Sequence, residues 1–443
     1  MHIALLSPKG PLYRHRGGIF RKSLRYSPLT LPTLASLVPP ELDARVTLVD
    51  EGIEDVPLDL DADVVAMTVI TGSAPRAYEI ARAYRARGVP VVLGGPHPTL
   101  VPEDAAPHAN AVVTGYAEDT WPELLRDLRR GQLRPRYTQA ADLSLAGRPL
   151  PRKDLVDARR YTTTAVFEAT RGCVHKCEFC VVPSAWGRRP LQKPVEDVVR
   201  EIVAQGTRKA IFVDLNLVAD PAYARRLFDA LVPLRLRWFG LATTLIGHDP
   251  DLMDRMVRSG CRGLLVGFES LSASGLAGSD KKFNDPSSYA ARIEQLHRRG
   301  VAVQGTFVFG LDTDGTEVFD ETARFCVETG IDLPRFAIQT PFPGTPLFAR
   351  LEREGRLLTR DWSLYDGQHV VFRPARMSPD QLLEGHQRAW RTVYSLRNIA
   401  RRLGRSRQLL QIAVPANLGY RYYAHHLHTH YTCDTLDGWK VAS

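Results

Sequence analysis

Strand-like and helix-like segments alternate along most of this 443-residue chain, and this alternation limits the folds open to it. In residues 1–135, short apolar, β-branched runs predict five strands: Ile3–Leu6, Val46–Val49, Val64–Val69, Val91–Leu93 and Ala111–Val113. Helical patterns lie between them, and the clearest spans residues 77–84 with apolar side chains at i, i+3, i+4 and i+7. Because such alternation gives a parallel sheet with right-handed crossovers, we expect a first α/β domain over residues 1–135.

The alternation pauses and then resumes in the second half of the chain. Residues 136–164 have little periodic signal and are expected to form a linker. Six further strands are then predicted: Ala165–Ala169, Ile211–Val213, Trp238–Ala242, Gly263–Val266, Gln304–Phe309 and Phe336–Gln339. Six strand–helix units over residues 165–375 suit a partial or full α/β barrel, whose chemistry sits at the carboxyl ends of its strands. Strand patterns stop after about residue 376, so residues 376–443 are expected to form a small helical C-terminal region.

Charge and composition exclude several classes of protein. The chain carries 58 Lys and Arg against 49 Asp and Glu, a net charge of +9, but its basic residues are scattered rather than gathered into a nucleic-acid-binding arm. No apolar run approaches the ~20 residues that a membrane span requires, and the N-terminus lacks the pattern of a signal peptide. We therefore expect a cytoplasmic protein with no membrane span and no nucleic-acid partner. Six cysteines are too few for a disulfide scaffold.

Three of the six cysteines are clustered. Cys173, Cys177 and Cys180 have the spacing C-x3-C-x2-C and directly follow the first predicted strand of the second half, whereas Cys261, Cys326 and Cys433 stand alone. A loop at that position lies on the reactive face of an α/β barrel. Three thiolates can bind three irons of a [4Fe–4S] cube, for which full protein ligation takes four cysteines. One iron would then stay open to a small-molecule ligand.

Two other interpretations of the cluster are weighed. A structural zinc site would need a fourth ligand, for which His175 is the local candidate, but zinc sites usually combine C-x-x-C with a second pair, which this sequence lacks. A cluster-bearing binding or sensor protein would need the cysteines and nothing else. An iron–sulfur centre with an open iron fits the cysteine spacing better than either of these two interpretations.

At these residues the chain resembles the radical S-adenosylmethionine (SAM) enzymes. The cysteine spacing, with an aromatic Phe179 before the last cysteine, resembles the family signature, and Gly263–Glu269 resembles the family's G-x-I-x-G-x-x-E strand with its end shortened by one residue. The N-terminal half resembles the B12-binding-type domain that precedes the barrel in one large subgroup. Typical segments of that subgroup are Gly94–Thr99, Gly115–Glu118, Gly305–Gly310 and Thr340–Thr345. The likeness covers about residues 1–375 and continues more weakly to about residue 400.

The resemblance implies a fold and a reaction. The fold is α/β: a Rossmann-like B12-binding-type domain over 1–135, a linker over 136–164, a partial (β/α)6-type TIM barrel with a [4Fe–4S] cluster over 165–375, and the helical region 376–443. In this family SAM chelates the open iron, and an external one-electron reductant of the flavodoxin or ferredoxin type reduces the cluster. Reductive cleavage of SAM gives methionine and a 5′-deoxyadenosyl radical, which removes hydrogen from an unactivated carbon of a small molecule.

The resemblance also implies SAM-binding residues. They are Phe179, Asp214, Asn216, Thr243, Gly267 and Glu269. Asp214 and Asn216 stand where many members have G-G-E to hold the methionine amino group, so one of them is expected to accept that hydrogen bond; substrate contact or helix capping is the alternative. Phe179 and Gly267 are placed beside the adenine, or else only in strand packing, and Thr243 contacts SAM or forms a strand-end turn.

The sequence leaves open whether the protein binds cobalamin. The predicted cobalamin-like pocket consists of Thr71, Gly72, Ser73, Gly94, Gly95, His97, Gly115 and Glu118, which follow the carboxyl ends of predicted strands. No His of the chain has Asp two positions before it, so the D-x-H-x-x-G motif is absent and no histidine is expected to coordinate cobalt. We favour cobalamin-assisted C-methylation in secondary or lipid metabolism, because the glycine-rich strand ends are present. The alternative is a cobalamin-free rearrangement, such as dehydration or deoxygenation of a sugar or natural-product intermediate.

Overall fold

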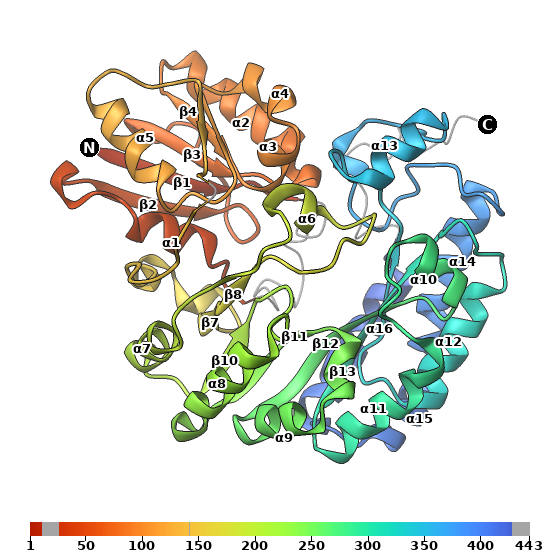
Figure 1. Cartoon of the computed structure of the whole chain (residues 1–443). Helices are drawn as coiled ribbons and strands as arrows, with labels where there is room; N and C mark the ends of the chain where they lie inside the picture. The colour runs from red at the N-terminus through yellow and green to blue at the C-terminus, as the bar shows by residue number, and fades with distance from the viewer. Residues whose placement is uncertain (11–25, 141, 428–443) are drawn as a thin grey trace.

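The computed structural model of the protein describes residues 1–10, 26–140 and 142–427. Figure 1 shows two α/β domains side by side, the N-terminal one in red and orange and the second in green and cyan, with the blue C-terminal helices against the second. Cys433 and the end of the expected C-terminal region lie outside the described residues. Among the described residues, no helix combines the length and the apolar character needed to cross a membrane.

The first domain is a parallel sheet covered by helices on both faces. Within residues 1–10 and 26–140 the strand order is β2-β1-β3-β4-β5-β6, and all neighbours are parallel. The strands are β1 (His2–Ser7), β2 (Arg45–Asp50), β3 (Val64–Thr68), β4 (Val91–Gly94), β5 (Ala111–Thr114) and β6 (Arg136–Thr138). The helices are α1 (Thr30–Ser36), α2 (Ala74–Ala86), α3 (Pro96–Leu100), α4 (Pro102–Ala105) and α5 (Thr120–Arg129). The strand order reverses between β1 and β3, which is where open α/β sheets bind ligands.

Local patterns explain most of this domain. The helical pattern at residues 77–84 becomes α2, and its four apolar residues are completely buried against the sheet. The short edge strand β6 lies in the segment expected to be a linker, so the first sheet extends three residues beyond the expected boundary at 135. Its three residues hold one buried side chain, Tyr137, which is too little for a sequence pattern.

The second domain contains the expected partial barrel. Among residues 142–427, six parallel strands have the order β14-β13-β12-β11-β10-β7, with β7 and β14 at the two edges. They are β7 (Val166–Phe167), β10 (Lys209–Phe212), β11 (Arg237–Ala242), β12 (Cys261–Glu269), β13 (Ala302–Phe309) and β14 (Arg335–Ile338). The helices of this region are α6 (Val181–Trp186), α7 (Val195–Gln205), α8 (Pro221–Leu231), α9 (Pro250–Arg258), α10 (Ala273–Gly278), α11 (Tyr289–Arg298), α12 (Val318–Thr329) and α13 (Pro346–Arg353).

Two further features complete the second half. A short antiparallel pair, β8 (Thr170–Arg171) with β9 (Leu191–Gln192), brackets the cysteine loop and was not expected from the sequence. The C-terminal region is helical, as expected, in α14 (Pro379–Val393), α15 (Leu396–Ser406) and α16 (Leu410–His425). These helices join the apolar core of the barrel rather than forming a separate one.

The carboxyl-end loops of the two sheets meet at one interface. In Figure 1, α6 lies between the two domains, and it packs on α3 of the first. A short 3₁₀ helix, η11 (Trp362–Leu364), packs on another, η4 (Thr71–Ser73), which directly follows β3. The fold therefore brings the predicted cobalamin-like loops of the first domain to the reactive face of the barrel.

Candidate active site

The three clustered cysteines share the loop between β8 and α6. Cys180 precedes α6, and its N–H donates to the Cys177 carbonyl at 3.0 Å. Burial raises the pKa of the Cys177 thiol to about 11, and the negative charges of Cys180 and Cys173 raise it as well. Such a thiol is protonated at neutral pH, so it becomes a ligand when a metal displaces its proton. Phe179 is half-buried against the barrel core beside them.

The donor set of the loop suits an iron–sulfur cluster. Three free cysteines stand within eight residues of one loop, and three thiolates of a [4Fe–4S] cube each bind a different iron. The residues present therefore fit the expected cluster.

A buried ion pair lies beside the thiols. Lys281 Nζ bonds to Glu269 Oε1, and the charges of both residues act on the pKa of Cys177 and of Cys180. Glu269 ends β12 with a φ of +66°, after a bulge that begins at Gly267. A Cβ at Gly267 would crowd Glu269 Oε1 and lie 3.1 Å from Lys281 Nζ, so a larger residue here would displace the ends of both side chains. The strand end that was predicted to bind SAM is thus close to the cysteine loop.

Asp214 holds two loops together. Its carboxylate is fully buried and accepts hydrogen bonds from the N–H of Ala169 (3.1 Å), from Thr170 Oγ1 (2.9 Å) and from the Thr170 N–H. Burial raises the pKa of Asp214 to about 7, and the nearby charge of Glu168 adds to the shift. The acceptor capacity of Asp214 is therefore used to tie the end of β10 to the start of the cysteine loop.

Three other side chains in this region each have a buried polar atom that forms no hydrogen bond within the described part of the chain. Asn216 Oδ1, Thr243 Oγ1 and His175 Nε2 are buried and have no hydrogen-bond partner among the described residues. Buried polar atoms are rarely left unsatisfied, so such atoms are expected to meet a ligand or ordered water. Asn216 and Thr243 follow neighbouring strands, β10 and β11, at the ends where SAM was predicted to bind. These atoms fit a polar cofactor.

The glycine-rich loops of the first domain also gather at one edge. Gly95 has a φ of +101°, and a Cβ there would lie 2.8 Å from the backbone nitrogen of Val69. Gly115 has a φ of +82°, and its N–H donates to Thr99 Oγ1 at 3.0 Å. Gly94 has ordinary backbone angles and has room for a Cβ. Together with Thr71–Ser73, these loops form the edge that faces the barrel.

His97 is placed beneath these loops rather than in them. The ring is completely buried, with Nε2 3.1 Å from Tyr78 Oη and 3.0 Å from Asp104 Oδ2, and Nδ1 3.4 Å from Thr71 Oγ1. Ser73 Oγ likewise bonds within its own turn, accepting from the Ile70 N–H. Both side chains therefore stabilise the loops, and the His97 ring also meets Trp362 of η11 edge-on.

Residues on both sides of the cysteine motif connect it to the first domain. Arg171, two residues before Cys173, pairs with Glu118 and, at 2.7 Å, with Glu168. Trp186, at the end of α6, stacks on Tyr116 with ring centroids 5.4 Å apart and planes 5° apart. Arg171 and Trp186 were not among the predicted site residues, although their positions next to the motif were a usable signal. Glu118, which was predicted to line the cobalamin-like pocket, is thus paired with a residue of the second domain.

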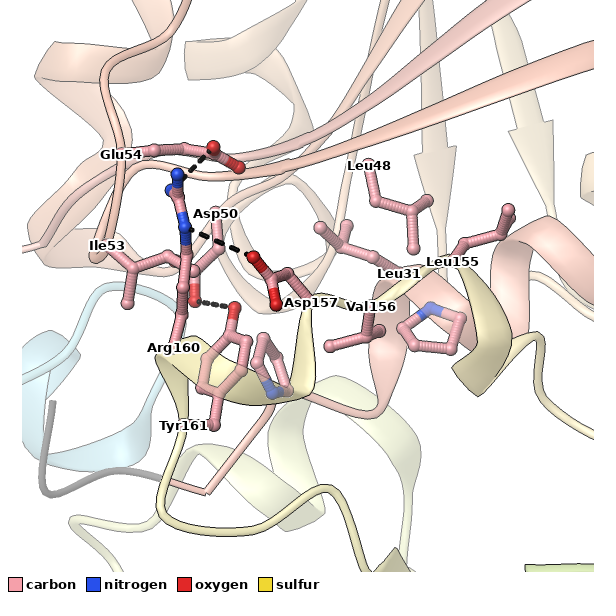
Figure 2. Close-up of a pocket in the computed structure, with 12 residues that line it drawn as sticks. Leu31, Leu48, Asp50, Ile53, Glu54, Leu155, Val156, Asp157, Arg160 and Tyr161 are labelled. Carbon is pink, nitrogen blue, oxygen red and sulfur yellow. Dashed lines mark hydrogen bonds and ion pairs between the residues drawn. The ribbon is translucent and has the colours of Figure 1, made fainter. Parts of the chain in front are cut away.

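A separate cavity of about 240 Å³ lies at the β2 edge of the first sheet (Figure 2). In Figure 2, Arg160 pairs with Glu54 (2.8 Å) and with Asp157 (3.6 Å), and Tyr161 donates to Asp50 at 3.0 Å. Its lining residues belong neither to the cysteine loop nor to the glycine-rich loops. We interpret it as a packing cavity between the linker and β2.

The sequence matches three family descriptions. Residues 41–125 match the B12 binding domain, residues 167–326 the radical SAM superfamily, and residues 345–425 a domain of unknown function, DUF4070. The chain is 32% identical over 389 residues to bacteriochlorophyllide d C-12(1)-methyltransferase of Chlorobaculum tepidum, covering 85% of this chain and 84% of that protein. It is 28% identical over 350 residues to hopanoid C-2 methylase of Rhodopseudomonas palustris, covering 75% and 66%.

Solved structures have the same fold. The radical SAM methyltransferase TsrM of Kitasatospora setae, solved with cobalamin and a [4Fe–4S] cluster, superposes with a TM-score of 0.64 at 18% identity, covering 80% of this chain and 78% of that one. The cobalamin-dependent SAM radical enzyme OxsB, solved with aqua-cobalamin and SAM, superposes with a TM-score of 0.69 at 13% identity, covering 96% and 72%.

Proposed function

Because this chain belongs to the radical SAM superfamily, in the group with an N-terminal B12-binding domain, we propose that it is a cobalamin-dependent C-methyltransferase acting on a small molecule. The observation that carries the proposal is the contact between the elements that flank the cysteine loop, β8 and α6, and the loop after β5 in the B12-type domain. Arg171 and Trp186, on either side of the cysteines, contact Glu118 and Tyr116 of the loop after β5. These contacts support a reaction that uses both cofactors together.

The residues present fit the cofactors of such an enzyme. The three thiols suit a cluster with one open iron, and the unpartnered atoms of Asn216 and Thr243 suit the polar groups of SAM. When bound, the cluster and SAM supply the radical that removes hydrogen from an unactivated carbon, and cobalamin supplies the methyl group. The chemistry belongs to the cofactors, while the protein binds, orients and excludes water.

We assign the following roles to residues of this chain. Cys173, Cys177 and Cys180 hold the cluster, and Asn216 and Thr243 orient SAM, with Gly267 and Phe179 beside it. The stacked pair Tyr116–Trp186 and the buried pair Arg171–Glu118 close the interface between the domains.

An electron must enter from outside, and the exposed face of the cysteine loop is basic. Lys176 is exposed and lies 3.5 Å from Asp280, and the exposed Arg188 donates to the Val174 carbonyl at 3.3 Å. Lys282, which follows the buried Lys281 in the sequence, is also exposed. We propose that this face receives an acidic one-electron reductant of the flavodoxin or ferredoxin type, because complementary charge speeds such encounters.

The proposal is tested on protein reconstituted with iron, sulfide and hydroxocobalamin under anaerobic conditions. We expect equilibrium binding of hydroxocobalamin, and reductive cleavage of SAM to 5′-deoxyadenosine and methionine. With substrate, a second SAM supplies the methyl group, so S-adenosylhomocysteine should form together with 5′-deoxyadenosine, and a deuterated methyl group on SAM should appear in the product. SAM cleavage without any cobalamin binding would contradict methylation and favour a cobalamin-free radical reaction.

A further inference from the structure

The segment between the barrel and the C-terminal helices touches both predicted cofactor sites. We call residues 344–365 the strap; it contains α13 and η11, and most of it lies within the match to a domain of unknown function. In Figure 1, α13 lies on the same side of the barrel as the first domain. Its helix α13 contacts the cysteine loop, and both its first residue, Gly344, and η11 contact the helices that follow β4.

Through α13, the strap binds the residue between two of the cysteines. Arg350 of α13 donates from Nε to Glu178 Oε1 at 2.7 Å and from Nη2 to Glu178 Oε2 at 3.3 Å. The backbone N–H of Leu347 donates to the Glu178 carbonyl at 3.2 Å, and Leu347 is completely buried. The turn from Cys177 to Cys180 is therefore held through both the side chain and the backbone of Glu178.

Arg350 is itself fixed by a second carboxylate. Its Nη1 lies 2.7 Å from Asp312 Oδ2, just after β13, and Asp312 Oδ1 lies 2.7 Å from Arg356 Nη2. The side chains of Glu178 and Arg350 are 15% and 26% exposed, so this two-point pair is partly shielded from water. Such a pair gives a defined geometry, unlike a single surface ion pair.

The strap is anchored to the first domain at two places, through Trp362 of η11 and through its first residue, Gly344. The indole of Trp362 meets His97 edge-on with ring centroids 5.9 Å apart, and its N–H donates to the Asp104 carboxylate. Gly344 has a φ of +78°, and a Cβ there would lie 3.0 Å from the carbonyl oxygen of Leu100. These contacts reach α3 and α4, directly after the glycine-rich loop Gly94–Gly95.

We propose that the strap positions the cysteine loop against the B12-binding domain, with Arg350 as a positioning residue for the turn that carries Cys177 and Cys180. The inference rests on the proposed cluster and not on methyl transfer. It has an electrostatic consequence, because Glu178 is bonded to Arg350 next to two cluster ligands. Without Arg350 the carboxylate would add an unbalanced negative charge beside the cluster, whereas without the carboxylate Arg350 would add a positive one.

The test uses full-length reconstituted holoprotein. We would compare Arg350→Gln, Glu178→Gln and Arg350→Lys with Arg353→Gln, an exposed arginine on the same helix that donates to the Ala349 carbonyl. The cluster's midpoint potential is measured by EPR-monitored redox titration, and its stability by the rate of iron loss to a chelator. We expect Arg350→Gln to shift the potential to more negative values and Glu178→Gln to shift it to more positive values. Iron loss should accelerate several-fold in both.

Two variants separate charge from geometry. Arg350→Lys keeps the charge but loses the two-point bond, so its potential should stay near that of the wild type while its iron loss accelerates. Trp362→Ala removes the distant anchor without changing any charge near the cluster, so it should accelerate iron loss and leave the potential unchanged. Arg353→Gln should match the wild type in both measurements.

Specific results would overturn the inference. If Arg350→Gln and Glu178→Gln shift the potential in the same direction, or no more than Arg353→Gln does, Arg350 does not position this turn. If Trp362→Ala loses iron at the wild-type rate, the strap is not anchored on the first domain. Wild-type protein that takes up no cluster would refute the proposed cluster and the strap together, whereas an intact cluster without methylation would refute the proposed function alone.

Discussion

At the scale of single residues, the five cysteines that the structure describes differ in surroundings. Cys173, Cys177 and Cys180 share one loop, while Cys261 and Cys326 are fully buried in the barrel core. Replacing the three loop cysteines with Ala should reduce iron after anaerobic reconstitution to background, because it removes every proposed ligand. Cys261→Ala and Cys326→Ala are the controls and should keep the cluster. Undiminished iron in the triple variant would refute the assignment.

The unpartnered atoms of Asn216 and Thr243 give a second prediction. If they bond to SAM, removing either one should weaken SAM binding by about 1–2 kcal/mol, roughly 5- to 30-fold in Kd. Asn216→Ala and Thr243→Val should show this in equilibrium binding to reconstituted protein, with the iron content unchanged. Thr243→Ser keeps the hydroxyl and should bind SAM like the wild type. Wild-type affinity in Thr243→Val would remove that residue from the SAM site.

Asp214 should instead affect stability, and in a pH-dependent way. Its folded-state pKa of about 7 lies above the usual 3.8. Between these two pH values the folded protein therefore keeps a proton that the unfolded chain has already released. The free energy of unfolding therefore falls as pH rises through this window. Asp214→Asn should remove that part of the fall, as measured by urea unfolding of the apoprotein from pH 5 to pH 8. Parallel curves for the two proteins would contradict the raised pKa.

At the scale of elements, the interface between the domains depends on the segment around the cysteine motif. Arg171 in β8 lies between two carboxylates, those of Glu118 and Glu168, and its side chain is 12% exposed. Arg171→Gln would leave two buried negative charges without a partner, which costs about 3–5 kcal/mol for a broken buried pair. We expect this loss in chemical unfolding of the apoprotein, whereas the exposed Arg189→Gln should change little. A loss below about 1 kcal/mol would mean that water screens the pair.

The strands and helices of both domains were predictable because each has its own period in the sequence. From Leu264 to Glu269, β12 alternates buried and half-buried residues, and α2 buries the face that its spacing predicts. By contrast, β6 and the β8–β9 pair have two or three residues each, too few to repeat a pattern. Their pairing is decided by the neighbouring strands, which no local pattern describes.

At the scale of the whole molecule, the chemistry of the site was more predictable than its contacts. The cysteine spacing and the glycine-rich strand ends are local features, so the sequence alone predicts the cluster and the B12-type loops. The Arg350–Glu178 bond joins residues 172 positions apart. The partners of Asp214 and His97 likewise come from other elements. Only the fold determines that the Asp214 carboxylate accepts hydrogen bonds from the described residues whereas Asn216 Oδ1 accepts none.

The two cofactor sites lie in different sheets, so one should be removable without the other. Gly94 ends β4 with ordinary backbone angles and room for a Cβ, whereas Gly115 has a positive φ and its Cβ would meet Gln139. Gly94→Leu is therefore the cleaner probe of the loops over which we expect the corrin to lie. It should abolish hydroxocobalamin binding and leave the iron content unchanged, because a bulky side chain would occupy space beside the flat macrocycle.

The matched control for this last prediction is Gly404→Leu. Gly404 also has ordinary backbone angles and open space around its Cβ position, but it lies in the C-terminal helix α15, away from the first sheet. Both variants should be compared by equilibrium hydroxocobalamin binding, iron content and urea unfolding. Tight cobalamin binding in a folded Gly94→Leu protein would mean that the corrin lies elsewhere. Loss of the cluster in the same variant would mean that the two sites are built as one, because the strap and the Arg171–Glu118 pair would then transmit the change across the interface.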